Sequence, residues 1–386
     1  MNMEQKNSQT ISTTSSHDNN ILDLSCHYQF ENGSSQFLFL AIDQNEKGGT
    51  FLNHSLSFSV ENFVQTLASC NGLILLSGYS IDQSCYYVFN PLTKHSTMIP
   101  QPCIQGHVVS VGLASNDNNS NNQFKVVLIE ANSSKLINGL EFHIFSSDDG
   151  TSKWNKVSHS IDLTLPSLPE LEFKELSIHP LYSNGSIHWE IGGYLLVYRV
   201  RENNCELIEL PNFFEDWSWQ STMTYRRCLC ESRGSVYYCY TDFDGFHIWG
   251  LLKENDNPEP FDDSKKFRWK LVHSVMHEVF VSKHQFFLDT LFKWEPYKIA
   301  PIAYSEKAQI IYLQIPGAVV GYNFDTGNLR SICRYSYQDM NFNCCSFYST
   351  FAFGTLNVLR GKDLVVTNGE IMELSLPIGE IEKLSF

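Results

Sequence analysis

The chain has 386 residues, of which 42% are hydrophobic, so it is long enough and apolar enough to bury a large core. Its formal net charge of −15 argues against wide contact with a nucleic-acid backbone. The sequence contains no run of about 18 apolar residues, so we expect no membrane span. The polar start also lacks the apolar region of a secretory signal, and we therefore expect a cytoplasmic or nuclear protein.

Along the chain, the first 23 residues are rich in Ser, Thr, Asn and Gln, and we expect a disordered polar segment there. Residues 24–386 are expected to form one domain. Four later stretches repeat a small turn, an apolar strand, a gap, and a second strand that ends in an aromatic residue and a polar turn. They begin at Asn71, Asn184, Arg233 and Lys307. Such a repeat of hairpins predicts a repeat architecture.

Two further units extend this pattern. One comprises Phe124–Ile129, Phe142–Ser146 and Trp154, and the other is completed circularly by Phe37–Ala41 near the start and the stretch from Phe351 to Val366 near the end. A single hairpin cannot bury its apolar faces in water, so several must stack, and a radial arrangement leaves only short edges. The sequence thus predicts an all-β, single β-propeller of about six blades of short antiparallel strands, and the family resemblance described below implies that it is kelch-like.

Helical periodicity is nearly absent from the sequence. The best helix candidates are Val60–Val64 and the segment from His277 to Thr290, and each also fits a strand followed by a loop. The densest histidine cluster, His273, His277 and His284, has the spacing of a helix face only if the second segment is helical.

The eleven cysteines are interpreted as reduced, because the count is odd and we expect a reducing compartment. Several of them, including Cys239, are expected to be small buried hydrophobic residues. The close pairs Cys228–Cys230 and Cys344–Cys345 lack a second pair at the spacing of a zinc site. Catalytic and phosphate-binding motifs are also missing, so the sequence predicts no metal, no cofactor and no enzymatic activity.

Several strings resemble the F-box-associated domain of plant F-box proteins, a kelch-related propeller. They lie in the order expected for that domain: 67–74, 86–94 with Ile99-Pro100, 182–189 with 207–211, and 269–275. Each motif residue also has a physical role. Asn71-Gly72 and Asn184-Gly185 suit turns with positive φ, and Trp189 and Trp269 suit packing between blades.

The resemblance implies a function in protein recognition. In that family a helical F-box precedes the propeller and binds the adaptor of a cullin ubiquitin ligase, while the propeller captures the target for ubiquitination. Residues 1–36 show no F-box pattern, and residues 24–40 look like the linker that follows an F-box. Either the chain is a truncated product of an F-box gene, or it is a free-standing propeller or competitor that binds targets without the adaptor; a propeller enzyme is a third alternative.

The target protein is unknown from sequence, but loops that pair aromatic with acidic residues are candidates for contacting it. One such loop contains Phe213, Phe214, Trp217 and Trp219, and another contains Trp294 and Tyr297. The alternative for the first loop is that its aromatic side chains pack inward between blades. The acidic stretch from Lys253 to Lys266 is expected to be a solvated loop.

Overall fold

The computed structural model describes a large part of the chain. The described residues are 21–29, 35–43, 51–58, 64–71, 73–79, 84–90, 95–115, 123–131, 140–148, 153–159, 180–191, 193–211, 227–253, 267–289, 299–315, 318–334 and 350–353. Their strands form four four-stranded sheets and one eight-stranded sheet, whose two halves are joined only by a parallel bridge between Leu181 and Ser69. Divided at this bridge, the strands give six groups of four antiparallel strands, which we number as blades 1 to 6. This confirms the predicted all-β propeller. None of the helical residues described here forms a segment long and apolar enough to cross a membrane.

The first three blades take up the N-terminal part of the chain. Blade 1 contains β24 (Thr350–Phe353), β1 (Ile21–Gln29), β2 (Ser35–Asp43) and β3 (Phe51–Phe58). Blade 2 contains β4 (Val64–Cys70), β5 (Leu73–Tyr79), β6 (Ser84–Asn90) and β7 (His95–Ile99). Blade 3 contains β8 (His107–Ser115), β9 (Phe124–Ala131), β10 (Leu140–Ser146) and β11 (Trp154–His159).

The other three blades follow in the same order, with one helix between the last two. Blade 4 contains β12 (Leu181–Ser183), β13 (Ser186–Ile191), β14 (Tyr194–Arg199) and β15 (Asn204–Glu209). Blade 5 contains β16 (Arg227–Ser232), β17 (Ser235–Thr241), β18 (Gly245–Lys253) and β19 (Phe267–Met276). The helix α2 (His277–Leu288) precedes blade 6, with β20 (Ala300–Ser305), β21 (Ile310–Ile315), β22 (Ala318–Asn323) and β23 (Leu329–Arg334).

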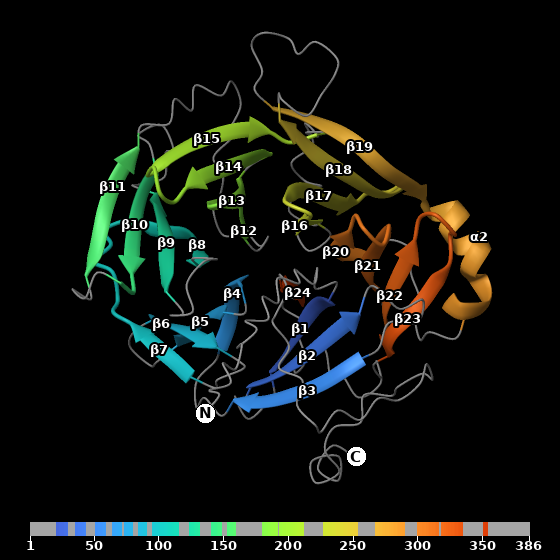
Figure 1. Cartoon of the computed structure of the whole chain (residues 1–386), viewed down its shortest axis with the longest axis horizontal. Coiled ribbons are helices and arrows are strands. Elements are labelled where there is room, and N and C mark those ends of the chain that lie inside the picture. Colours follow the sequence, from blue (N-terminus) through green and yellow to red (C-terminus); the bar gives the residue numbers. More distant parts are fainter. Residues whose placement is uncertain are drawn as a thin grey trace, which may run out of the picture.

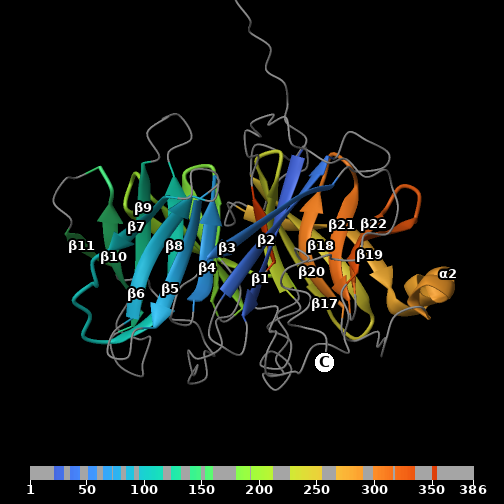
Figure 2. The ribbon, with the colours of Figure 1, turned by 90° about the horizontal axis from the view of Figure 1, so that it is seen from below.

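The blades stand around a common centre, with α2 at the rim beside blades 5 and 6 (Figure 1). Figure 2 shows the same ring from its edge. The ring closes in blade 1, where β24 from the C-terminal part pairs with β1 and places Phe353 opposite Asp23. Circular closure was therefore predicted correctly for Phe351–Phe353, and residues 354–366 of the same prediction lie outside the described part. The strand beside β24 is β1 and not the segment Phe37–Ala41, which lies one strand further out in β2.

The expectation of a linker over residues 24–40 is wrong, because β1 and β2 pair there along their whole length, from Ile21 opposite Asp43 to Gln29 opposite Ser35. The first strand begins at Ile21, three residues before the expected start of the propeller. Residues 1–20 lie outside the described part. The physical reason is that apolar and polar residues alternate from Leu22 to Tyr28, while Phe37 to Ile42 form a continuous apolar run, and both patterns are typical of strands.

The second helix candidate is confirmed by α2. The first helix candidate was Val60–Val64. Its last residue, Val64, is the first residue of β4, and residues 60–63 lie outside the described part. His277 and His284 are in α2, whereas His273 is in β19, so the three histidines do not share one helix face.

The turns between the first two strands of the blades have the conformation that their sequences predict. Asn71, Asn184 and Gly185 have φ angles of 45°, 50° and 77°. Arg233 and Gly234 make the equivalent turn in blade 5 with φ angles of 54° and 79°. Two successive residues with positive φ form the turn whose twist matches that of the flanking strands. This is why Asn-Gly and Arg-Gly recur at these places.

The cores lie between neighbouring blades. Trp189 on β13, with 1% of its surface exposed, packs in the layer between blades 3 and 4 with Phe142, Ile144 and Tyr198. Trp269 on β19 packs against the layer between blades 4 and 5. Both were predicted to pack between blades, and both do.

The outer strands of two blades repeat one polar contact with the blade before. The indole Nε1 of Trp269 donates to the carbonyl of Glu209 at 2.8 Å, and that of Trp154 on β11 donates to the carbonyl of Pro100 at 2.7 Å. Each acceptor lies at or just after the end of the preceding blade's outer strand. These bonds link the rims of successive blades and give each indole N–H the partner that a packed tryptophan usually has.

Candidate protein-binding surface

The six residues that the sequence analysis proposed as target contacts lie outside the described part of the chain. They are Phe213, Phe214, Trp217, Trp219, Trp294 and Tyr297. The first four belong to the interval between β15 and β16, and the other two to the interval between α2 and β20. Most of the acidic stretch after Lys253 is also outside. A contact role and an inter-blade role for these aromatic residues both stay predictions.

Exposed apolar side chains gather instead on blade 5 and α2. Of eight large hydrophobic side chains that are exposed in the described part, six lie between residues 243 and 286. Four of them surround the start of the helix and its outer face, and we call them the α2 surface: Phe243, Met276, Val279 and Phe286, which are 68%, 45%, 55% and 89% exposed. Apolar groups that collect on one part of a surface indicate an interaction site.

The helix is held to the propeller through its other face. Phe280 is fully buried, and its ring meets those of Phe246 on β18 and Tyr322 on β22 at centroid distances of 5.5 and 5.7 Å. Leu288 at the end of the helix is also buried. Val279 and Phe286 are both exposed, although the backbone at His284 between them departs from helical geometry, with φ of −122° and ψ of 16°. The docked face therefore fixes the direction in which these two side chains point, which is away from the blades.

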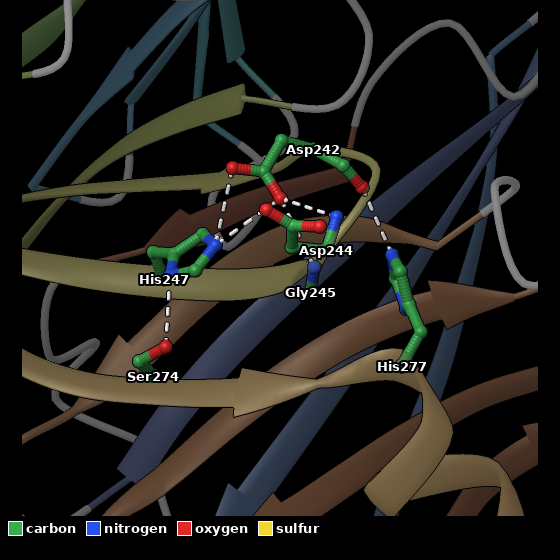
Figure 3. Close-up of polar contacts among 6 residues, drawn as sticks. All are labelled: Asp242, Asp244, Gly245, His247, Ser274 and His277. Atoms are coloured by element: carbon green, nitrogen blue, oxygen red, sulfur yellow. Dashed lines mark hydrogen bonds and ion pairs between the residues drawn. The ribbon is translucent and has the colours of Figure 1, made fainter.

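The start of α2 is tied to the turn between β17 and β18 (Figure 3). The backbone N–H of His277 donates to the carbonyl of Asp244 at 2.8 Å, and His277 Nε2 lies 2.9 Å from the carbonyl oxygen of Asp242. At Gly245 an added Cβ would lie 2.0 Å from the carbonyl oxygen of Val275, so only glycine allows this close approach. The turn that carries Phe243 is thus fixed against the first residue of the helix.

Within this turn, the Asp242 carboxylate accepts hydrogen bonds from the N–H groups of Asp244 and Gly245 at 2.9 and 3.0 Å. His247 Nε2 lies 3.2 Å from the same oxygen, and its Nδ1 lies 3.0 Å from Ser274 Oγ (Figure 3). The order Asp, His, Ser resembles that of hydrolase triads. Here, however, the carboxylate also closes the turn through two backbone N–H groups, and the three side chains join three segments of blade 5. We interpret the arrangement as a structural support of the α2 surface.

The charge of Asp242 should make this support sensitive to acid. Burial by itself would raise the pKa of Asp242, but the hydrogen bonds from His247, Gly245 and Asp244 lower it overall. A carboxyl whose pKa is lower in the folded state stabilises the fold fully above its unfolded pKa of about 3.9, and this contribution is lost as the pH falls through the folded value. We expect Asp242→Asn to reduce the free energy of unfolding at pH 7.

Denaturant unfolding of both proteins at pH 7, 5 and 3 measures this effect. The difference between wild type and Asp242→Asn should be the same at pH 7 and 5 and smaller at pH 3, because the wild-type carboxyl then begins to lose its charge. A difference that stayed constant down to pH 3 would show that the charge of Asp242 contributes nothing.

A second buried polar cluster lies in blade 3. Glu130 on β9 accepts hydrogen bonds from the N–H groups of Gln105, at 2.8 Å, and Gly106, and its other carboxylate oxygen lies 2.5 Å from His143 Nε2. Burial alone would raise the pKa of Glu130, but these hydrogen bonds lower it overall. Because two of its three donors are the backbone N–H groups of residues 105 and 106, the carboxylate attaches these residues to the blade.

Comparison with known proteins agrees with this fold. The family described as F-box protein At3g26010-like, beta-propeller, matches residues 42–350. The chain belongs to this family of F-box protein β-propellers. It is also similar to the F-box protein At5g07610 of Arabidopsis thaliana, with 23% identity over 70% of this chain and 63% of the relative. It thus spans less than two thirds of that relative's length. The expected resemblance to plant F-box proteins is confirmed.

Solved structures show more distant similarity. The Nidogen/Laminin complex has a chain with 9% identity and a TM-score of 0.39, covering 86% of this chain and 97% of that one. TolB from Acinetobacter baumannii has 8% identity and a TM-score of 0.38, covering 81% of this chain and 61% of that one. At these values the similarity says nothing about function.

The α2 surface was missed by sequence reasoning. The segment was considered as a helix, but its apolar residues occur on several sides, with Val279 beside Phe280 and Phe286 beside Phe287. A helix docked on a core usually shows one apolar stripe, and this segment does not. The seven-residue spacing of Val279 and Phe286 was the available signal, but only the docking of Phe280 shows which side is exposed.

Proposed function

We propose that the chain is the target-binding propeller of an F-box protein and that it binds its target protein through the α2 surface. The observation that carries this proposal is the exposure of Phe286 and Val279 on a helix whose opposite face is anchored in the propeller. Rigid presentation of exposed apolar side chains lowers the entropy lost on binding. Aromatic side chains at the centre of such a surface commonly contribute most of the affinity.

The substitution Phe286→Ser tests this surface. Because the side chain is 89% exposed, its loss should change the free energy of unfolding by no more than about 0.5 kcal/mol. We expect target recovery by the tagged chain from plant extract, measured by quantitative mass spectrometry, to fall at least tenfold. Val279→Ser should lose the same proteins. The matched control is Met98→Ser, which removes a side chain of 65% exposure on β7 in blade 2.

Partners that depend on Phe286 and Val279 but not on Met98 support the proposal. Equal recovery by all three variants would contradict it and return attention to Phe213, Phe214, Trp217, Trp219, Trp294 and Tyr297. A large fall in melting temperature for Phe286→Ser would also contradict the assumption that this ring faces solvent.

We further propose that target binding serves a cullin ubiquitin ligase, as the F-box family relationship suggests. The alternative is a propeller or competitor that binds the target without the ligase adaptor. Direct binding of the purified chain to the adaptor, with a complete F-box protein as positive control, separates the two. Micromolar or tighter binding favours the ligase receptor, and absence of binding favours the adaptor-free protein.

A further inference from the structure

Three cysteine sulfurs converge between blades 5 and 6. Cys228 and Cys230 are two residues apart on β16 and therefore lie on one face of that strand, while Cys239 on β17 lies directly opposite Cys228. The three Sγ atoms lie within 4.8 Å of one another. Those of Cys230 and Cys239 are 3.7 Å apart.

The spacing of Cys230 and Cys239 is close to that of two sulfur ligands on one ion. A metal–sulfur bond is about 2.3 Å long, so two sulfurs at tetrahedral or trigonal angles on one centre lie roughly 3.8–4.0 Å apart, and the narrower angles of a pyramidal trivalent arsenic centre bring them somewhat closer. The sulfur of Cys228 lies within 4.8 Å of the other two and would move toward them on binding. We propose that Cys228, Cys230 and Cys239 form a three-sulfur site for one soft, thiophilic ion, with trivalent arsenic as the best match in charge.

The surroundings of the three sulfurs determine which ion suits them. Cys239 is completely buried, Cys230 is 2% exposed, and both pack with apolar residues such as Ile248 and Ile311. A net charge left in such a place is costly. Structural zinc sites use four protein ligands, whereas this cluster offers three. Cu(I) on three thiolates would leave two negative charges in the core.

Trivalent arsenic avoids that cost. Arsenous acid reacts with three thiols so that three As–O bonds break and three As–S bonds form. Each hydroxyl leaves as water with one thiol proton, and no oxidation or reduction occurs. The product carries no net charge. The half-buried Cys228 supplies the route by which the first As–S bond can form.

The spacing of cysteines in the sequence did not reveal this cluster. Cys228 and Cys230 are close in the chain, but the third sulfur comes from the neighbouring strand, nine residues after Cys230. Zinc sites are recognised in a sequence by two close pairs of ligands. Here there is one close pair, and the third cysteine comes from β17, which pairs with β16.

The test adds arsenite to the reduced, full-length chain in a phosphine reductant without free thiols. Native mass spectrometry should show one arsenic per chain, and X-ray absorption at the arsenic edge should show three sulfur neighbours. Cys230→Ser should weaken binding by more than about 100-fold, since even loss of a group that only supports a ligand costs 10–100-fold. Cys70→Ser, at a buried cysteine in blade 2, is the matched control and should bind as the wild type does.

Circular dichroism confirms that each variant is folded. Cys228→Ala provides a second variant at the more exposed member, in case Cys230→Ser does not fold. Arsenite should raise the melting temperature of the wild type and of Cys70→Ser but not that of Cys228→Ala. A parallel titration with Cu(I) should give weaker binding than arsenite. The proposal is overturned if arsenite does not bind, if Cys230→Ser and Cys228→Ala bind as the wild type does, if the absorption spectrum shows oxygen neighbours, or if Cu(I) binds more tightly.

Discussion

Replacement of Trp189 by alanine is expected to lower the free energy of unfolding by about 3–5 kcal/mol. The side chain is among the largest that are completely buried, and it fills the layer between blades 3 and 4 beside Tyr198. Removal of the indole leaves a cavity that two packed sheets can close only in part. Because folded domains are stable by only about 5–15 kcal/mol, the variant should melt far below the wild type. Thermal and denaturant unfolding measure the loss.

Two companion variants separate packing from other effects. Trp189→Phe keeps most of the volume, and the indole N–H has no hydrogen-bond partner among the described residues, so this change should cost less than half as much. Gly112→Ala would place a Cβ 2.7 Å from Trp189 Cζ2 and 2.8 Å from Ile187 Cγ2, which should cost about 1–3 kcal/mol. Part of that cost should disappear in the Trp189→Ala background, since one clashing group is gone. Strictly additive costs would argue against this contact.

The next residue on the same strand supports the second large effect. Glu190 points to the opposite face of β13 and forms an ion pair with Arg227 on β16, which links blades 4 and 5. The two side chains are 4% and 17% exposed. Glu190→Ala leaves the guanidinium buried without its counter-charge, and we expect a loss of about 3–5 kcal/mol. Denaturant unfolding at neutral pH measures it.

The matched control is Glu206→Ala, which breaks the ion pair with Arg199 inside blade 4, where the side chains are 24% and 31% exposed. Solvent screens this pair, so its loss should cost about 0–1 kcal/mol. Removal of both buried charges in Glu190→Leu/Arg227→Met should recover much of the stability lost in Glu190→Ala. If Glu190→Ala and Glu206→Ala cost the same, the inter-blade pair has no special role.

The candidate surface was less predictable than the fold. The aromatic residues that the sequence favoured as contacts lie in intervals between blades, outside the described part of the chain. The surface found here rests on Val279 and Phe286, which stand beside the equally apolar Phe280 and Phe287 in the sequence. Which of four neighbouring apolar residues face water depends on the rotation of the helix against β18 and β22. That rotation is set by contacts between residues far apart in the chain.

The sequence by itself determined the hairpins, their turns and the ring of blades, because strand alternation and positive-φ turn residues act over a few residues. It also predicted the closure of the ring and the inter-blade position of Trp189 and Trp269. The tertiary structure alone decided that β24 pairs with β1, that α2 exposes Phe286, and that Cys239 joins Cys228 and Cys230. Each of these three features depends on strand register or on docking between segments that are far apart in the chain. A local sequence pattern does not contain that information.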